Sequence, residues 1–586
     1  MTMATTSAGS RRIATISATV KSAWPNRYDV IVFLAIGALF VAVAHGAKLM
    51  HKPLAGLEVN PVSLDPKNLP QYALLTTLRM FAALGFSLLF TFLVAPLAAK
   101  SKKAERLIIP TLDILQSVPV LGFLTFTVVF FMNLFPGSQL GAELAAIFAI
   151  FTSQAWNMTF SFYQSLTTVP RDLEEAARQF RLTPWQRFWK LEAPFATPGL
   201  VWNMMMSMSG GWFFVVASEA ISVGDTQITL PGIGAFLSLA IQQKNIGAVA
   251  WAVAAMAVVI VLYDQLVFRP VVAWSDKFRV ELVAAQAQPK SWVLDLIRRA
   301  QLVSVINVVL SRLLQVFSGG VSSLSKQIPE APTVGKTASR VFDWVWNIAL
   351  IAFTFWAAWS VFSYVWATLG WSDFEEAITD GFITFFRVVV LIIVASLIWV
   401  PIGVYIGLRP ALAERVQPVA QFLAAFPANV LFPFVVVGIA TFHLNPDIWL
   451  SPLIVLGTQW YILFNVIAGA SVFPSDLSEA STLYRVKRWQ WWRKVMLPGI
   501  FPYYVTGALT ASGGSWNASI VAEVASWGDT KLEAHGLGAY IAKATNAGDF
   551  HRVVLGVGVM SVFVVVVNRA LWRRLYALAD RRLRLD

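Results

Sequence analysis

Long apolar runs alternate with short charged segments along this chain. Twelve of the runs approach or exceed the roughly 20 residues that a helix needs to cross the hydrocarbon core of a bilayer. They lie near residues 29–47, 77–98, 118–135, 140–164, 195–221, 246–268, 344–368, 385–408, 426–442, 448–470, 499–522 and 552–573. The pattern therefore predicts an all-α membrane protein with about twelve transmembrane helices.

The basic residues predict an orientation for these helices, because cytoplasmic loops carry an excess of Lys and Arg. Basic groups follow the second and fourth runs and also occupy both ends of the chain: Lys100, Lys102, Lys103, Arg106, Arg178, Arg181, Arg187, Lys190, Arg11, Arg12, Lys21, Arg27, Arg573, Arg574, Arg581, Arg582 and Arg584. All of them fall on one side if both termini are cytoplasmic. The segment 47–76, with Lys48, Lys52 and Lys67, is a modest exception.

Composition supports a membrane protein. Of the 586 residues, 57% are hydrophobic and 13% are charged, whereas soluble domains carry about 25% charged residues. Topology accounts for the net charge of +13, so we expect the lipid bilayer and no nucleic acid as a partner. Zero cysteines and five scattered histidines predict no metal site, and no arrangement of a nucleophile with a base suggests catalysis.

The chain contains an internal repeat. Residues 170–236 align with 474–540 at an offset of 304 residues without a gap, and Arg79 and Arg387 open the second run of each half at a slightly different offset. Each half therefore has six runs in the same orientation, which predicts a parallel repeat around an axis along the membrane normal. We expect the two halves to enclose a central pathway.

The repeat predicts five segments. They are a cytoplasmic N-terminal segment (1–28), a first six-helix domain (29–268), a cytoplasmic linker (269–343), a second six-helix domain (344–575) and a cytoplasmic tail (576–586). In the linker, apolar residues recur at helical spacing: Trp292, Leu296, Val303, Ile306, Leu310, Leu313 and Phe317. This favours an amphipathic helix at the membrane surface, with a regulatory docking helix as the alternative.

A short stretch at the end of the linker, Gly335-Lys336-Thr337, resembles the end of a phosphate-binding loop. That motif needs a glycine five residues before Gly335, where this chain has Glu330. We therefore expect no nucleotide site in this chain.

The loop between the fourth and fifth runs of each half has the pattern of a short cytoplasmic helix. Asp172 with Glu175, and Asp476 with Glu479, have the three-residue spacing of a capping box. The preceding proline favours an extended start. The expected apolar face consists of Leu173, Ala176 and Phe180 in the first half and of Leu477, Ala480 and Tyr484 in the second.

These loops resemble the Glu-Ala-Ala loop of permeases from binding-protein-dependent ABC importers, in which the glutamate precedes a proline by nineteen residues. Glu175 and Pro194 have this spacing, as do Glu479 and Pro498. The Trp-Gln pair at 185–186 and the Gly-Asp-Thr…Gly-x-Gly stretch at 224–234, both repeated in the second half, resemble the nitrate, sulfonate, taurine and bicarbonate branch. The chain is similar to a fused two-half form of this family.

The resemblance implies a permease subunit of an ATP-driven importer in the bacterial inner membrane, with the fold of a type I importer. Its substrate would be a small anion such as nitrate, a sulfonate, taurine or bicarbonate. Its partners would be two cytoplasmic ATPase subunits, which bind ATP and Mg²⁺, and a periplasmic substrate-binding protein. The chain itself would hold no cofactor and would have no catalytic residue. The residues expected to couple to the ATPases are Asp172, Glu175, Ala176, Ala177, Phe180, Arg181, Asp476, Glu479, Ala480, Tyr484 and Arg485.

The chain departs from the family pattern six residues after each glutamate, where the family usually has glycine and this chain has Arg181 and Arg485. Glycine at such a turn often adopts a positive φ, which arginine tolerates poorly. We therefore expect the turn to be built differently and the arginines to face acidic residues of the ATPase.

Polar side chains inside the runs are candidates for the translocation pathway, because burying them in lipid is costly. The candidates are Arg79, Gln154, Trp212, Glu219, Arg387, Gln459, Trp516 and Glu523. The glutamates lie near the outer ends of the fifth and eleventh runs. Three alternatives stay open: hydrogen bonds between helices, interfacial anchoring or snorkelling, and pairing of the glutamates with Lys or Arg.

Two other functional classes are weaker alternatives. A six-plus-six secondary transporter would need coupling carboxylates or broken helices at the midplane, and it would have no use for duplicated docking helices. A membrane enzyme would need a catalytic arrangement that the sequence does not offer.

Overall fold

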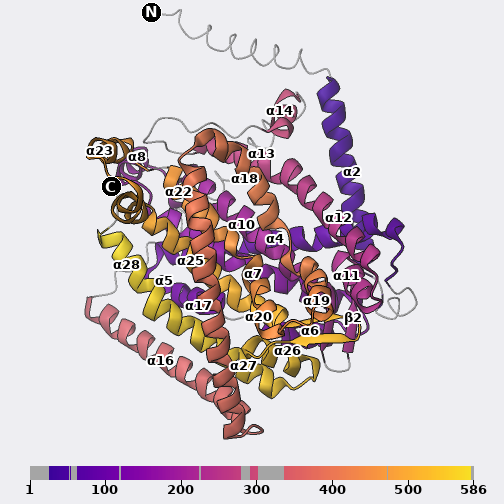
Figure 1. The fold of residues 1–586 in the computed structure, drawn as a ribbon. Coiled ribbons are helices and arrows are strands. Elements are labelled where there is room, and N and C mark those ends of the chain that lie inside the picture. Colours follow the sequence, from indigo (N-terminus) through magenta and orange to yellow (C-terminus); the bar gives the residue numbers. More distant parts are fainter. Residues whose placement is uncertain are drawn as a thin grey trace, which may run out of the picture. The chain divides into compact units, whose positions relative to one another are not determined.

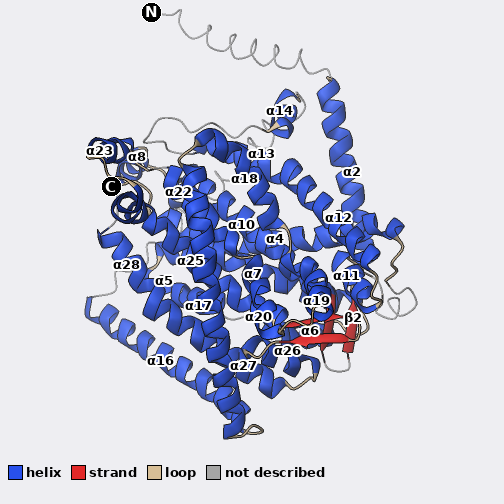
Figure 2. Ribbon diagram, viewed as in Figure 1, coloured by secondary structure: helices blue, strands red, loops and turns tan. Residues whose placement is uncertain are grey.

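The structure is a computed structural model that describes residues 26–51, 53, 62–117, 120–223, 226–278, 291–300, 336–471 and 473–582. The chain forms two compact units. One contains Met1–Leu49, Gln164–Trp202 and Leu262–Val334, and the other contains Met50–Tyr163, Asn203–Val261 and Gly335–Asp586. Figure 1 labels the elements along the chain, and Figure 2 shows that helices dominate both units.

The first half of the chain consists of the following elements: α2 (Arg27–Met50), α4 (Leu69–Lys100), α5 (Lys102–Ser117), α6 (Val120–Leu134), α7 (Gln139–Thr167), α8 (Arg171–Gln179), α9 (Pro184–Arg187), α10 (Ala193–Glu219), β1 (Ala220–Val223), β2 (Thr226–Thr229), α11 (Ile233–Gln242), α12 (Ile246–Tyr263) and α13 (Arg269–Ser275). A five-residue π-helical segment, Phe188–Glu192, leads into α10. A second one, Asp264–Phe268, joins α12 to α13. The short helix α14 (Trp292–Arg299) follows in the linker.

The second half repeats this order: α16 (Lys336–Trp366), α17 (Trp371–Gly407), α18 (Pro410–Ala425), α19 (Phe432–Thr441), α20 (Pro446–Trp449), α21 (Ser451–Leu456), α22 (Gln459–Ser471), α23 (Ser475–Leu483), α24 (Arg488–Trp491), α25 (Leu497–Ala522), β3 (Val524–Trp527), β4 (Thr530–Glu533), α26 (Leu537–Asn546), α27 (Phe550–Val567) and α28 (Arg573–Arg582). Two π-helical segments, Trp492–Met496 and Asn568–Trp572, correspond to the two π-helical segments of the first half. The repeat in sequence is therefore a repeat in structure.

Helices occupy all twelve of the expected apolar runs, so the all-α membrane fold is confirmed. Within the described residues, seven helices are long and apolar enough to cross a bilayer, and nine spans result if each of two bent pairs counts as one. The bent pairs are α18 with Ala428–Thr441 and Pro446–Leu456 with α22. The remaining three runs form α6, which has only 15 residues, and α7 and α25, which are rich in small and polar residues.

In the linker, the start of the predicted amphipathic pattern forms one short helix, which ends at Arg299 because Ala300 is extended. The helix α14 begins at Trp292, with the Ser291 side chain accepting a hydrogen bond from the Leu294 amide (3.2 Å). The expected continuation over Val303–Phe317 lies outside the described residues, as does Gly335. Lys336 begins α16, eight residues before the expected start of the span.

The long helix α25 packs closely on α22, and most residues of its buried face are small: Gly499, Gly507, Ala508, Ala511, Ser512, Ser515, Ala518, Ser519 and Ala522. A Cβ atom at Gly507 would lie 2.7 Å from the Tyr461 carbonyl oxygen. Small residues of this kind let helix backbones approach inside a membrane, where dispersion contacts replace the hydrophobic effect as the driving force.

Each half carries one β-hairpin directly after its long α10 or α25 helix, drawn in red in Figure 2. The antiparallel pairs run from Ala220↔Thr229 to Val223↔Thr226 and from Val524↔Glu533 to Trp527↔Thr530. Strand β1 contacts α11 and α26, and strand β3 contacts the same two helices. The hairpins and the helices that follow them therefore interlock the two halves.

One end of this junction is tied by two contacts between the halves. The Gly528 amide donates a hydrogen bond to the Ile241 carbonyl (2.9 Å), and Lys244 Nζ lies 2.9 Å from Asp529 Oδ2. The hydrogen bond and the attraction from Lys244 lower the pKa of the Asp529 carboxyl below its usual value. Both side chains are largely exposed, so the contact orients the hairpin tip and adds little stability.

Candidate functional site

The predicted loop helices form as α8 and α23, but the predicted capping box is wrong. Pro170 and Pro474 are the N-cap residues, and neither helix has a side-chain hydrogen bond at its cap. The proline starts each helix two residues earlier than an aspartate cap would. Asp172 and Asp476 therefore lie in the first turn, where a negative charge is still favourable next to the helix dipole.

The turn that ends α8 also differs from the expectation. Arg181 adopts a left-handed conformation (φ 50°), the conformation for which the family uses glycine. The Leu182 amide donates to the Ala177 carbonyl (3.1 Å) and the Arg181 amide to the Arg178 carbonyl (2.9 Å). This is the Schellman pattern. The expectation that arginine would force a different turn is therefore wrong.

The second half repeats the same turn at Arg485 (φ 53°). The Val486 amide donates to the Ser481 carbonyl (2.9 Å), and the Arg485 amide to the Thr482 carbonyl (3.1 Å). Helix termination takes precedence over the residue's preference because the two hydrogen bonds satisfy carbonyls that would otherwise lack a partner. A left-handed residue with a Cβ atom costs about 1–2 kcal/mol, and the chain bears this cost in both loops.

Large apolar side chains protrude from both loops. Phe180 is 80% exposed, and its counterpart Tyr484 is 79% exposed next to Leu483, which is 80% exposed. Glu175 and Glu479 are exposed as well. In the first half, Ala177 is buried and Ala176 is half-buried, so the alanines face the body of the protein and the ring faces outward. A role of these exposed rings in coupling to a partner stays a prediction.

The tryptophan-glutamine stretch after the first loop has a local structural role. Thr183 and Gln186 form a capping box at the start of α9: the Gln186 amide donates to Thr183 Oγ1 (3.3 Å) and the Thr183 amide to Gln186 Oε1 (3.2 Å). The second half has Lys487 in place of Thr183, and α24 has no side-chain cap. The spacing Thr-x-x-Gln was the available sequence signal for this cap.

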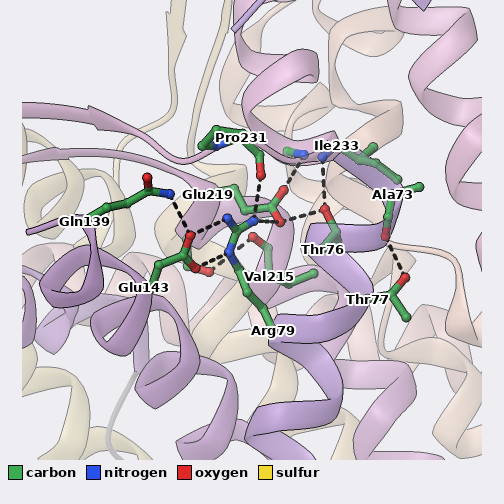
Figure 3. Close-up of polar contacts among 12 residues, drawn as sticks. Ala73, Thr76, Thr77, Arg79, Gln139, Glu143, Val215, Glu219, Pro231 and Ile233 are labelled. Atoms are coloured by element: carbon green, nitrogen blue, oxygen red, sulfur yellow. Dashed lines mark hydrogen bonds and ion pairs between the residues drawn. The ribbon is translucent and has the colours of Figure 1, made fainter. Parts of the chain in front are cut away.

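A buried charge cluster lies at the first-half glutamate (Figure 3). Arg79 binds Glu143 in a bidentate manner, with Nε–Oε2 at 2.6 Å and Nη2–Oε1 at 2.8 Å, and its Nη1 atom lies 2.7 Å from Glu219 Oε1. The same Nη1 atom donates to the Pro231 carbonyl (3.0 Å). All three charged side chains are at most 1% exposed. The cluster therefore ties α4, α7 and α10 together.

Glu219 also anchors the start of α11. Thr76 Oγ1 donates to Glu219 Oε1 (2.7 Å), the Gly234 amide donates to Glu219 Oε2 (2.7 Å), and the Ile233 amide donates to Thr76 Oγ1 (3.0 Å). A carboxylate is favourable at this helix N-terminus because free amides point toward it. A Cβ atom at Gly232 would lie 2.3 Å from the Glu219 carboxyl, which explains the repeated Gly-x-Gly.

The second half builds the same cluster in a looser form. Arg387 Nη1 lies 2.6 Å from Glu523 Oε1, and Thr384 Oγ1 donates to the same oxygen (2.9 Å). The counterpart of Glu143 is Asp447, which is 3.6 Å from Arg387 Nη2 and 37% exposed. The His535 amide donates to Asp447 Oδ1 (2.7 Å). The shorter aspartate therefore shares its charge between the arginine and a surface loop.

Sequence reasoning missed four members of these clusters. Thr76 and Thr384 lie three residues before the two arginines, and Glu143 and Asp447 are related by the same offset of 304 that defines the repeat. The last pair was hidden because a search for identical residues does not match glutamate with aspartate. The offset itself was the signal that could have found it.

The glutamates thus form the ion pairs that sequence analysis held open as an alternative. Arg79 is fully buried, so it does not snorkel to an interface. Trp212 and Trp516 are also buried, with 0% and 2% exposure. A pathway role for these side chains stays a prediction.

The two glutamines of the fourth and tenth spans join helices by hydrogen bonds. Gln154 Oε1 accepts from Ser87 Oγ at 3.4 Å, which is long. Gln459 Oε1 accepts from Trp399 Nε1 (2.8 Å), and Gln459 Nε2 donates to the Leu456 carbonyl (3.1 Å). These contacts match the alternative of inter-helix bonding. Within the described residues, no group of three or more His, Asp or Glu side chains could hold a metal ion.

Comparison with known proteins finds the same family model twice. The model described as the binding-protein-dependent transport system inner membrane component matches residues 87–269 and 399–585. Each match contains one loop helix and one of the repeated glutamates Glu219 and Glu523, and together they cover more than half of the chain.

Three curated proteins are similar to part of this chain. The nitrate import permease protein NrtB of Leptolyngbya laminosa is 26% identical over 182 residues, which is 31% of this chain and 62% of that protein. The bicarbonate transport system permease protein CmpB of Synechococcus elongatus is 26% identical over 176 residues (30% and 60%). The glycine betaine/proline betaine permease ProW of Escherichia coli is 29% identical over 163 residues (28% and 44%). The chain spans less than two thirds of each relative, while the family model recurs in both halves. The chain therefore belongs to the family of binding-protein-dependent transport system inner membrane components.

Proposed function

We propose that this chain is the fused permease subunit of an ABC importer, with both halves forming one translocation pathway. The observation that carries the proposal is the pair of loop helices. Both end in the same left-handed arginine, and both expose a large ring that no membrane span requires. Two copies of one docking element fit two copies of an ATPase subunit.

The chemistry of the loops favours a partner with an apolar groove rimmed by acidic groups. Phe180 and Tyr484 would enter the groove, while Arg181 and Arg485 would pair with carboxylates at its rim. Charge-assisted pairs of arginine and carboxylate are stronger than neutral hydrogen bonds. The cost of the left-handed arginines would then be offset on docking.

In this proposal, ATP and Mg²⁺ bind to the partner subunits and this chain catalyses no reaction. The stretch around Lys336 lacks the earlier glycine of a phosphate-binding loop, which supports the assignment. The loops and both termini would face the cytoplasm of a bacterial inner membrane, and a substrate-binding protein would approach from the opposite side.

A small anion is the proposed substrate, such as nitrate, bicarbonate, a sulfonate or taurine. The relatives named for nitrate and bicarbonate support this class, and the relative named for betaines is a further candidate class, because betaines carry a carboxylate. Arg79 and Arg387 are already paired with carboxylates. The anion would therefore be bound mainly by neutral donors, unless the clusters open during the cycle.

The test is ATP hydrolysis by the co-purified ATPase subunit in nanodiscs with the full chain. We expect the double variant Glu175→Ala/Glu479→Ala to keep its melting temperature, because neither carboxylate caps its helix, and to lose most of its coupled ATPase activity. Glu174→Ala is the matched control, since the other half has Ser478 at that position. Unchanged coupling in the double variant would refute the docking assignment.

A further inference from the structure

An acidic cleft of about 600 Å³ opens in the second half between the start of α17, the end of the β3–β4 hairpin, α26 and the start of α27. Four carboxylates line it: Glu376, Asp380, Glu533 and Asp549. We call this the acidic cleft. Its volume lies within the range of about 300–1,000 Å³ found for small-molecule sites.

Two of the four carboxylates are already neutralised. Lys543 Nζ lies 2.7 Å from Glu533 Oε2, and Arg552 lies 3.8 Å from Asp549 and 2.9 Å from Asp373. Lys543 and Arg552 are therefore both engaged with carboxylates at the cleft. His535, which also lines the cleft, contacts Asp447.

Glu376 and Asp380 form no ion pair with any described residue. They lie one turn apart on α17, at i and i+4, where like charges repel and destabilise a helix by a few tenths of a kcal/mol. Both side chains line the cleft. Among the described residues, no cation lies within ion-pairing distance of either carboxylate, and His535, Lys543 and Arg387 attract Asp380 only from farther away.

A third group points to a ligand. The Tyr540 side chain lines the same cleft and is only 7% exposed, yet its hydroxyl has no hydrogen-bond partner among the described residues. A buried hydroxyl without a partner costs roughly 1–3 kcal/mol. A ligand in the cleft that bonds to this hydroxyl would remove that cost.

In the first half, two rings occupy the equivalent positions. Asp380 corresponds to Tyr72 at the offset of Arg387 from Arg79, and Tyr540 corresponds to Phe236 at the offset of 304. Tyr72 and Phe236 are both buried, with ring centroids 6.3 Å apart. The second half therefore has the Asp380 carboxylate where the first half has the Tyr72 ring. It has the Tyr540 hydroxyl where the first half has the unsubstituted Phe236 ring.

We propose that the acidic cleft binds a cation that carries N–H donors, an ammonium or a guanidinium group. Such a group donates to the Glu376 and Asp380 carboxylates and to the oxygen of Tyr540, and it neutralises the pair on α17. The donor could be a free small amine or an arginine or lysine side chain presented by a protein partner. These two sources share one chemistry and differ in the space they need.

The cleft would face the outer side of the membrane, and this position rests on the proposed topology, in which α16 runs outward from the linker. The two carboxylates without an ion pair would repel a small anion, so the site is separate from the proposed substrate. Its ligand is therefore a second component, which acts on one half only.

The experiment is calorimetric titration of the full chain in nanodiscs, without an ATPase, with two probes. Agmatine represents a free small cation, and acetyl-Gly-Arg-Gly-amide represents a presented side chain. We expect saturable binding of at least one probe, weakened at least tenfold in Glu376→Gln/Asp380→Asn and several-fold in Tyr540→Phe. The control Glu375→Gln removes the same charge from the next residue of α17, which does not line the cleft, and should bind like the unmodified chain.

The two probes distinguish the two sources. Tighter binding of agmatine supports a free amine, and binding of the peptide at least as tight supports a presented side chain. Absence of binding by both probes would overturn the proposal, as would equal weakening in the Glu375→Gln and Glu376→Gln/Asp380→Asn variants. Removing the repelling charges should not unfold α17, so loss of binding would not reflect misfolding. Because neither ATP nor transport enters the assay, its failure leaves the proposed importer function standing.

Discussion

The left-handed arginines of the two loops separate stability from coupling in one set of variants. Arg181→Gly and Arg485→Gly remove a Cβ atom from a residue with φ near 50°. The left-handed conformation costs an L-residue about 1–2 kcal/mol, while glycine loses roughly 0.5–1 kcal/mol through the greater freedom of the unfolded chain. The net expectation is a local stabilisation of about 0.5–1 kcal/mol at each turn. Coupling should nevertheless fall, because the guanidinium is lost.

Alanine and lysine variants complete the comparison. Arg181→Ala loses the guanidinium but keeps the strained Cβ atom, so coupling should fall as far as in the glycine variant without any stabilisation. Arg181→Lys keeps a positive charge and should retain more coupling than either. His443→Gly is the matched control: His443 also has φ 50° at a helix end, but it lies between α19 and α20 and belongs to neither loop.

Hydrogen exchange and ATPase activity provide the two measurements. A local gain of about 1 kcal/mol slows exchange of the amides that close the turn, such as that of Leu182, about fivefold if they exchange by local opening. We expect this slowing at the mutated turn in Arg181→Gly and in His443→Gly, and reduced ATPase coupling only in the former. Faster exchange in Arg181→Gly would refute the strain argument. Full coupling in the glycine and alanine variants of both loops would show that the arginines do not contact the partner.

The buried clusters yield two further predictions. Arg79→Ala should lower the melting temperature of the purified chain far more than Arg387→Ala, because it strands two buried carboxylates, a defect of about 3–5 kcal/mol, whereas Asp447 is partly solvated; equal losses would contradict the looser second cluster. Gly232→Ala should also lower the melting temperature, since its Cβ would meet the Glu219 carboxyl at 2.3 Å, while Gly558→Ala, with nothing within 4 Å, should be neutral; a harmless Gly232→Ala would show that the loop can move away.

Asymmetry between the halves recurs in each of these features. The second half has Asp447 for Glu143, Tyr540 for Phe236 and Lys487 for Thr183. A homodimer of identical halves could not hold these differences on one side only. In a fused chain, the first half can keep a closed, buried charge cluster. The second half can at the same time form a cleft beside its own charge cluster.

Local patterns in the sequence were sufficient for the helices, the repeat and the two loop helices. Hydrophobic runs, turn residues and the offset of 304 each depend on residues close in sequence or on comparison of the chain with itself. The family followed from the spacing of Glu175 and Pro194 and of its copy. The prediction of a capping box was wrong because it considered only the spacing Asp-x-x-Glu. It ignored Pro170, which occupies the N-cap position.

Tertiary structure alone decided the partners of the buried charges. Arg79 meets Glu143 and Glu219 across 64 and 140 residues of sequence, and no local pattern shows which charges will meet at such separations. The acidic cleft likewise exists only because packing places α17, α26 and α27 around a space that paired rings fill in the first half. The left-handed turn at Arg181, in contrast, depends on local hydrogen bonds that end α8, which outweigh the backbone preference of one residue. Sequence fixes local conformation through short-range sterics and periodicity, whereas burial and ion pairing depend on which surfaces the folded helices bring together.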